Sequence, residues 1–524
     1  MVYLMTDKAV IHDAYYWERI GFRNAWISVT QVPLVYLLAS KSNIIAFVIG
    51  SSHERLNWLH RWVSRTLLLT VTVHGGFFMA EWVRADFVTL ELDMMPMVKY
   101  GIGAWAILVW TFITSLCPLR SMAYEIFVLQ HIATAAVFLW LLWVHVPSYA
   151  SYNVWFAIGA ISFDRVSRWL MAVYRNLRLQ RGSSCSGSKA IGHHVELRAM
   201  ASDVTIVTIK DVHMSWRAGQ HLYLWIPRLG LLESHPYTIA TPYLTSKGCH
   251  CNEIQLAIKA QAGFSRRIFR YAMRAEGLPR NSLTGIVLGP YGVPPKWEAY
   301  ETLILISAST GASFTLPILE SMLNNHETIC IQRIKFLLIV RERGHNEYYV
   351  KRLSNALSRA GALGIDLDVE IAVTGDGNSV ADDDAVAVQE DHHSHVSEGD
   401  IEGLESEKAH QPYALVKSHS PSNSTSSWNT LAPERDCCCA EDGEKSQSLL
   451  PSKAIIYSYE RPDIASFIRC PVEMTGGETC IAVCGGKSLV ASVRNFVASL
   501  SDERAVHKGT GAQGLYLHVE EYCF

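Results

Sequence analysis

The sequence predicts a helical membrane domain followed by a soluble part in which an antiparallel sheet precedes a parallel α/β sheet. Apolar residues make up 49% of the 524 residues and crowd into the first third of the chain, from about Ala25 to Val173. Further along, Val204–Lys210 and Ile254–Lys259 alternate polar and apolar residues, as half-buried strands do. From about Glu298, apolar strands alternate with helical segments, as in a doubly wound sheet.

Five apolar segments have the length of about 20 residues that a helix needs to cross a bilayer. They are Ala25–Gly50, Leu59–Trp82, Gly101–Leu119, Tyr124–Val146 and Tyr152–Tyr174. Basic residues follow the fifth segment and occupy the turns before the second and the fourth, whereas the loop Val83–Lys99 carries only Arg84 and Lys99. Because Lys and Arg mark the cytoplasmic side, the chain leaves its fifth segment on that side.

These changes of pattern divide the chain into regions. They are an N-terminal segment (1–24), a membrane domain (25–174), a linker (175–192), a strand-rich domain (193–297) and an α/β domain (298–524). Within the last region, residues from about 375 to 451 are rich in Asp, Glu, Ser and His. Such a tract cannot bury enough apolar area to offset its ordering entropy, so we expect a disordered insertion there.

The net charge and the spacing of the cysteines argue against nucleic-acid binding, a cysteine-bound metal site and a disulfide framework. The net charge is −3 and no basic patch is interleaved with aromatic residues, so nucleic acid is not an expected partner. The 12 cysteines contain no metal-type pair of CxxC motifs. A disulfide framework is not expected in a chain of this length either.

Four histidines lie within the predicted membrane segments. His60 and His74 share the second segment, and His131 and His145 share the fourth, with fourteen residues between the members of each pair. Fourteen residues advance about 21 Å along an α-helix and end ~40° short of four full turns, so both members of a pair face the same way. The two segments run in one direction, because a single segment separates them. His60 therefore comes level with His131, and His74 with His145.

Each level offers two imidazoles from opposite sides, which is the axial ligation of a six-coordinate haem iron. The sequence thus predicts two b-type haems stacked across the hydrocarbon core, the inner one near the cytoplasm. Bis-histidine ligation leaves no open position on the iron, so it suits electron transfer. The alternative interpretation is a set of satisfied polar residues, or a proton relay, within a helical bundle.

A motif in the strand-rich domain carries a family resemblance. The segment His235–Ile239 (HPYTI) resembles the flavin-binding motif of the fungal ferric/cupric reductase (metalloreductase) family, which is related to the NADPH oxidases. The resemblance implies a ferredoxin-reductase-like module, with an antiparallel β-barrel that binds FAD and a doubly wound α/β domain that binds NADPH. In that family the aromatic ring and the neighbouring hydroxyl lie against the isoalloxazine, which implies these roles for Tyr237 and Thr238.

A second segment extends the expected flavin site. Gly263-Phe264-Ser265 opens a helix, whose free backbone N–H groups and dipole suit the FAD pyrophosphate. The expected FAD-binding residues are His235, Pro236, Tyr237, Thr238, Gly263, Phe264 and Ser265.

The nucleotide site is expected at the turn Ser309–Ser313, which follows the strand Thr302–Ser307 and precedes a helix. This is the geometry of a phosphate-binding βα turn, and it implicates Thr310 and Gly311. The family usually has more glycine here, roughly A-G-G-x-G, whereas this chain has only Gly311.

Other motifs of the family extend the resemblance towards the C-terminus. Cys484-Gly485 resembles the nicotinamide-site motif C-G-P, although Gly486 stands in place of proline, and Arg461-Pro462 resembles the motif G-R-P. Arg341 follows a strand where the family holds the 2′-phosphate, which implies NADP rather than NAD. The family ends in an aromatic residue that stacks on the flavin, a role that falls to Phe524.

The resemblance spans roughly residues 19–524 without the polar tract, and it implies an activity. NADPH passes hydride to FAD, with Tyr237, Thr238, Cys484 and Phe524 at the reacting rings. Single electrons then cross the two haems to a ferric or cupric ion, free or bound to a siderophore.

The expected setting is the plasma membrane, or the vacuolar membrane, with the nucleotide-binding domains cytoplasmic; a permease or oxidase partner is left open. The family usually has two further membrane segments before the first one seen here.

Other functions remain open at this point. An NADPH oxidase would deliver the electrons to oxygen. A transporter would use the membrane histidines as a proton relay. A membrane scaffold without catalysis is favoured by the glycine-poor turn at Ser309–Gly311.

Overall fold

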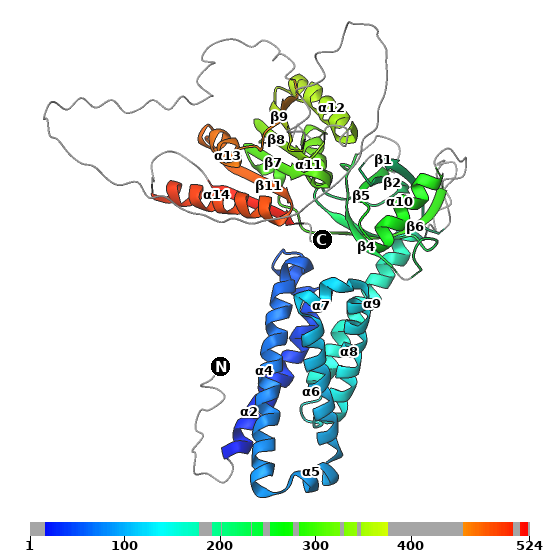
Figure 1. Ribbon diagram of the computed structural model, residues 1–524, viewed down its shortest axis with the longest axis vertical. Coiled ribbons are helices and arrows are strands. Elements are labelled where there is room, and N and C mark those ends of the chain that lie inside the picture. The colour runs from blue at the N-terminus through cyan, green and yellow to red at the C-terminus, as the bar shows by residue number, and fades with distance from the viewer. Residues whose placement is uncertain are drawn as a thin grey trace, which may run out of the picture.

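The computed structural model describes residues 16–177, 191–200, 202–231, 233–244, 252–275, 282–324, 330–342, 347–375, 454–506 and 514–521. These residues form a bundle of helices along the long axis of the molecule, with two sheets beyond one of its ends (Figure 1). The polar tract expected from about 375 to 451, like Phe524, lies outside the described residues apart from Gly375.

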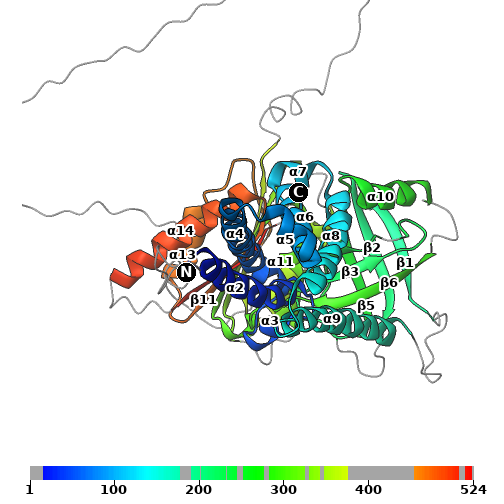
Figure 2. The same cartoon turned by 90° about the horizontal axis from the view of Figure 1, so that it is seen from below.

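The bundle contains all five expected membrane segments. Its helices are α2 (Tyr16–Ala39), α3 (Ile44–Val48), α4 (His53–Ala85), α5 (Val88–Met94), α6 (Pro96–Thr114), α7 (Cys117–Met122), α8 (Tyr124–His145) and α9 (Tyr152–Asn176). α4 packs chiefly against α2, α8 packs chiefly against α6, and α9 packs against α2. Figure 2 looks at the bundle from the end away from the sheets.

The helix ends differ from the expected segments for local reasons. α2 begins at Tyr16, before the expected start at Ala25, and it stops at Ala39. There Asn43 caps the separate helix α3 by accepting two backbone N–H groups. Among the described helices, α4, α6 and α8 are long and apolar enough to cross a membrane. α2 and α9 are 24 and 25 residues long, but they carry more polar and charged residues along their length.

The first sheet is antiparallel throughout. Its strands are β1 (His193–Met200), β2 (Val204–Val212), β3 (His221–Trp225), β4 (His235–Thr238), β5 (Asn252–Lys259) and β6 (Ser282–Tyr291), in the order β4-β3-β6-β1-β2-β5. Val195 lies opposite Ile209, and Leu197 lies opposite Val207. These four apolar side chains form part of one core with helix α10 (Gly263–Ala275). The alternation seen in the sequence therefore marks the face that the sheet buries.

The second sheet is parallel and has helices on both faces. Its strands are β7 (Thr302–Ala308), β8 (Arg333–Val340), β9 (Asp366–Val373), β10 (Ile456–Ser458), β11 (Thr479–Gly485) and β12 (Leu515–Glu521), in the order β10-β9-β8-β7-β11-β12. The short turns η1 (Trp297–Ala299) and η2 (Ser309–Gly311) precede and follow β7. Helices α11 (Ala312–Asn324) and α12 (Glu347–Leu363) share one core with the sheet, and α13 (Ile464–Glu473) and α14 (Lys487–Val506) share the other. This is the doubly wound arrangement that the sequence predicted.

The last membrane helix joins the antiparallel sheet directly. Asn176 ends α9, and its side-chain amide donates to the Val287 carbonyl of β6 at 2.7 Å and accepts the Val287 N–H at 2.9 Å. The Asn176 carbonyl also accepts the N–H of Gly192, and Leu177 forms a bridge with Ile191. The two ends of the expected linker are thus held together beside β6.

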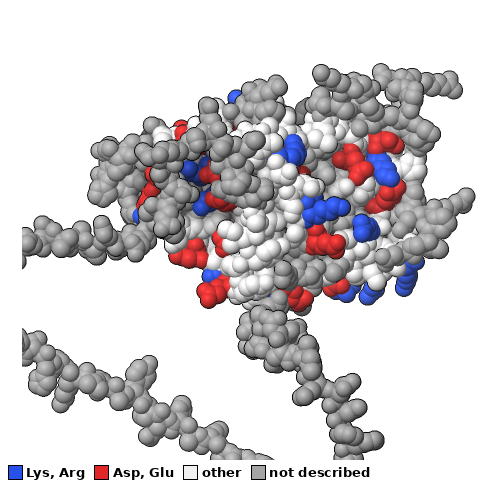
Figure 3. All heavy atoms as spheres, turned by 90° about the horizontal axis from the view of Figure 1, so that it is seen from above, with Lys and Arg blue, Asp and Glu red and all other residues white. Residues whose placement is uncertain are grey.

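The outer face of the two sheet domains carries charges of both signs. Figure 3 shows acidic and basic side chains interspersed on the face seen from above, with white surface between them. On this face the described residues form no extended basic patch of the kind that binds nucleic acid.

We predict that Asn176→Ala loosens the joint between α9 and β6. The substitution leaves the buried N–H and C=O of Val287 without their partner, which should destabilise the fold by about 2 kcal/mol. Thermal unfolding of the purified protein in detergent measures the loss. Asn153→Ala is the control, because its side chain makes a single 3.2 Å bond within its own turn. An equal effect of the two substitutions would contradict the prediction.

Candidate functional site

The membrane histidines occupy the two levels that their spacing predicted. His74 on α4 and His145 on α8 face each other near the end of the bundle away from the sheets, with ring centroids 6.2 Å apart. Two imidazole nitrogens that lie about 2 Å from one metal ion, on opposite sides of it, place their ring centres about 6 Å apart. At the other level, His60 lies on α4 and His131 on α8. The outer pair in particular has the separation that a shared iron requires.

Backbone carbonyls orient three of the four imidazoles. The Nδ1 atoms of His60, His74 and His145 donate to carbonyl oxygens at 3.0, 3.0 and 2.8 Å. The acceptors are Val35 and Gly21 on α2 and Met97 on α6. A bond at Nδ1 fixes the tautomer and leaves Nε2 free as a metal ligand. His131 differs, since its buried Nδ1 has no hydrogen-bond partner among the described residues.

The space between α4 and α8 is wide enough for a large planar group. α4 makes no extensive contact with α8 in the described structure, because each helix packs chiefly on another. A cavity of about 530 Å³ separates them at the outer level and is lined by His74 and His145. On α6, a Cβ at Gly101 would lie 2.4 Å from the His145 ring, so glycine is needed for the ring to take this place. These residues fit a bis-histidine haem.

The expected flavin motif forms β4 and its surroundings. His235 stacks on Phe264 of α10, with centroids 5.1 Å apart and planes at 20°. Tyr237 is half-buried against the core of the sheet, and burial raises the pKa of its phenol. Thr238 pairs with His221 of β3, so the two side chains lie on one face of the sheet. The structure therefore brings the HPYT motif and the start of α10 together, as the sequence predicted.

The start of α10 holds an unexpected acidic group. Gly263 has φ +53°, and a Cβ there would lie 2.9 Å from the carboxylate of Glu125 at the start of α8. Glu125, Glu233 and His235 place their ligand atoms within 4.8 Å of one another. Glu125 is exposed, whereas Glu233 and His235 are partly buried. The Ser265 hydroxyl accepts the Gln261 N–H at 3.0 Å and helps to shape the turn.

The nucleotide turn has glycine at its closest approach to a neighbouring strand but not at its left-handed position. In η2, Ser309 has φ +51°, a conformation that glycine adopts more readily. A Cβ at Gly311 would lie 2.4 Å from the carbonyl oxygen of Cys484, at the end of the neighbouring strand β11. The single glycine of the turn therefore sits at its closest approach to β11, beside Thr310. Burial raises the pKa of the Cys484 thiol, which keeps it protonated.

The remaining expected residues lie around the same edge of the sheet but are not joined by contacts. Arg341 follows β8, and its carbonyl accepts the N–H of Gly375 at 2.9 Å. Arg461 follows β10 and, like Arg341, is exposed. Neither guanidinium bonds another residue in the part of the chain that the structure describes. Gly485 packs on Leu489 of α14.

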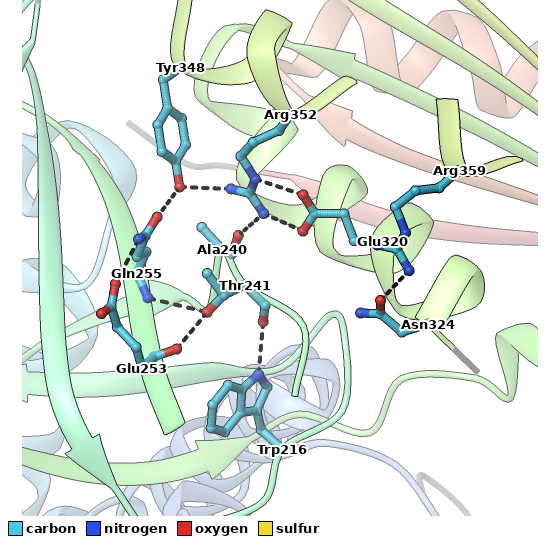
Figure 4. Close-up of polar contacts among 10 residues, drawn as sticks. All are labelled: Trp216, Ala240, Thr241, Glu253, Gln255, Glu320, Asn324, Tyr348, Arg352 and Arg359. Atoms are coloured by element: carbon cyan, nitrogen blue, oxygen red, sulfur yellow. Dashed lines mark hydrogen bonds and ion pairs between the residues drawn. The ribbon is translucent and has the colours of Figure 1, made fainter. Parts of the chain in front are cut away.

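One contact that sequence reasoning missed joins the two sheet domains (Figure 4). Arg352 of α12 donates through Nε to Glu320 at 2.8 Å, through Nη1 to the Tyr348 hydroxyl at 2.7 Å, and through Nη2 to the Ala240 carbonyl at 2.7 Å. The Tyr348 hydroxyl in turn donates to Gln255 of β5 at 2.7 Å. Ala240 directly follows the flavin motif, so this network fixes the motif against the α/β domain. From the sequence alone, Arg352 cannot be distinguished from a solvent-exposed arginine on a helix.

We predict that Arg352→Lys weakens this interdomain network. Lysine keeps the charge, but its single nitrogen cannot bond Glu320, Tyr348 and Ala240 together, so we expect a loss of about 3 kcal/mol, as for a broken buried pair. Thermal unfolding and hydrogen exchange at Ala240 are the measurements. Arg359→Lys is the control, since Arg359 bonds Leu323 and Asn324 within its own domain.

Three family models match successive parts of the chain. The model of a ferric reductase like transmembrane component matches residues 24–142, that of an FAD-binding domain matches residues 191–295, and that of a ferric reductase NAD binding domain matches residues 300–498. Among solved structures, the ferredoxin reductase in carbazole 1,9a-dioxygenase matches with a TM-score of 0.33 and 14% identity, over 63% of this chain and 69% of that one.

Curated relatives of this chain are also named as ferric reductases. A probable cell surface ferric reductase of Aspergillus oryzae is 26% identical over 56% of this chain and 40% of its own. Ferric reductase transmembrane component 4 of Saccharomyces cerevisiae is 24% identical over 57% of this chain and 39% of its own. The chain thus spans about two fifths of the length of these relatives. It is an integral membrane protein whose successive parts match the models of a ferric reductase like transmembrane component, an FAD-binding domain and a ferric reductase NAD binding domain.

Proposed function

We propose that this protein uses NADPH on the cytoplasmic side of a membrane to reduce a ferric or cupric ion on the other side. The observation that carries the proposal is the pair of imidazole levels on α4 and α8, with the outer rings 6.2 Å apart. FAD would convert the electron pair of a hydride into single electrons, and two haem irons held by His60, His74, His131 and His145 would conduct them. The proposed electron path therefore uses all three parts that the family models match, namely the transmembrane component, the FAD-binding domain and the NAD-binding domain.

The chain's own residues would hold these groups in place. The carbonyls of α2 and α6 keep three imidazoles turned towards the gap between α4 and α8. Thr238 and Tyr237 would receive the flavin ring. Gly311 lets the turn after β7 lie against the end of β11, at the edge where parallel sheets bind their ligands. Arg341 and Arg461, exposed beside that edge, would pair with the phosphates of NADPH.

The proposal places the protein in the plasma membrane with its nucleotide-binding domains in the cytoplasm. The name of the Aspergillus oryzae relative, a cell surface ferric reductase, supports this membrane over the vacuolar one. The basic residues at the sheet-facing end of α9 support the cytoplasmic side for the domains.

We predict that each of the four histidines is needed for haem. Alanine at His74 or His145 should remove the outer haem and lower the Soret absorbance of the purified protein by roughly half. Alanine at His60 or His131 should do the same at the inner level. His194→Ala on β1 is the control and should leave the spectrum intact. A full Soret band in all four variants would rule out the proposed ligation.

The methionines that line the outer cavity indicate which metal ions the protein accepts. Met79, Met95 and Met97 line the cavity that contains His74 and His145. Thioether sulfur is a soft ligand that favours Cu(I), the product of cupric reduction. Met97 is also the residue whose carbonyl orients His145, so its position lies beside the outer level. These side chains support copper as an acceptor alongside iron.

We predict that the double variant Met95→Leu, Met97→Leu reduces cupric ions less well while its ferric reduction stays as in the wild type. Leucine keeps the apolar bulk but lacks the sulfur, so KM for the cupric ion should rise about tenfold. Met94→Leu is the matched control, because Met94 is 73% exposed and does not line the cavity. An unchanged KM would show that copper does not use these thioethers.

A further inference from the structure

A carboxylate links the first turn of α4 to the FAD-binding domain. Glu54 Oε1 lies 3.1 Å from Nε2 of His53, its neighbour on α4, and 3.1 Å from Nε2 of His221, the first residue of β3. One oxygen therefore lies at ion-pair distance from two imidazoles that belong to different domains. The side chains of His53 and His221 are only 16% and 20% exposed, so both rings are largely shielded from water.

Further contacts surround this bridge. The His221 ring stacks on Tyr291 of β6, with centroids 5.9 Å apart, and the His53 ring meets the same tyrosine at 6.1 Å. Beside them, the Lys41 ammonium lies 3.3 Å from the centre of the Tyr223 ring, which is also on β3. Three side chains from the membrane domain thus converge on two neighbouring strands.

The loop that carries Lys41 is itself held in place. The backbone N–H of Ser42, the next residue, donates to Asp164 of α9 at 2.8 Å, and Asp164 also bonds Arg168 at 3.4 Å. Burial and the nearby Arg168 lower the pKa of Lys41 to about 8, while Glu54 opposes the shift. At cytoplasmic pH the ammonium therefore remains mostly charged over the ring, where a cation is attracted.

The bridge lies between the two parts that must exchange electrons. His60 is six residues beyond Glu54 on α4, about 9 Å along the helix axis. On the other side, His221 pairs with Thr238, and both side chains lie on one face of the sheet. Glu54 thus connects the helix that carries the inner histidine with the strand pair that carries the expected flavin contact.

We propose that Glu54 is a positioning residue that docks the FAD-binding domain on the inner end of α4. Exposed ion pairs contribute little, and the Glu54 side chain is 41% exposed. The two imidazoles, however, are shielded, and each would lose a charge-assisted acceptor if the carboxylate were removed. The bridge therefore sets how closely the flavin and inner haem sites approach. This consequence for electron transfer rests on the proposed function, whereas the docking itself does not.

Hydrogen exchange and rapid kinetics on the full-length protein test the proposal. In Glu54→Ala, amide exchange in β3 should rise while exchange in the distant strand β2 stays as in the wild type. Reduction of flavin by NADPH, followed by the loss of oxidised flavin absorbance, should keep its rate. Reduction of haem, followed in the Soret region, should slow about three- to tenfold, as expected for a partly screened charged hydrogen bond.

A double-mutant cycle separates docking from general damage. His221→Ala should slow haem reduction as Glu54→Ala does, and the double variant should be no slower than His221→Ala alone. Glu196→Ala is the matched control, because it breaks an ion pair with Lys210 at 2.5 Å in the same domain, on the strands β1 and β2.

Two outcomes would overturn the docking role. One is unchanged exchange in β3 together with unchanged haem reduction in Glu54→Ala; the other is a double variant that shows the product of the two single effects. A wild-type protein without haem would instead refute the proposed function, and the exchange measurement would still decide whether Glu54 docks the domain.

Discussion

Hydrogen bonds from imidazole Nδ1 atoms to backbone carbonyls determine how the membrane bundle is built. A polar ring within a helical bundle needs a partner, because the hydrocarbon around it offers none. His60 and His74 find theirs on α2, and His145 finds its partner on α6. The bonds therefore tie α4 to α2 and α8 to α6. Two helix pairs result, and the gap between them is the place where the remaining ring nitrogens meet.

Much of this arrangement could be predicted from the sequence because it depends on periodicity. Equal spacing of the histidines on two helices of one direction is enough to give two levels, and the structure has His74 opposite His145. Alternation in β5 and the nearly unbroken apolar run in β7 report which faces of a strand are buried. Such patterns depend only on residues that are close in the sequence, so they can be recognised from the sequence alone.

Contacts between distant elements were not predictable in the same way. Arg352 bonds Ala240, more than a hundred positions earlier, and Glu54 meets His221 across a domain boundary. No spacing rule relates these residues, and each reads by itself as a solvated charge. The nucleotide turn shows the reverse case. Its departure from a glycine-rich pattern is tolerable because the crowding falls on one position, Gly311, which lies against Cys484.

The pairing of Leu177 with Ile191, together with the bonds of Asn176 and Gly192, changes the meaning of the segment between α9 and β1. Because these contacts hold the end of α9 directly beside β1 and β6, they set the distance between the membrane helices and the FAD-binding domain. The orientation of the FAD-binding domain therefore follows the tilt of α9, so a bilayer that tilts this helix would also turn that domain.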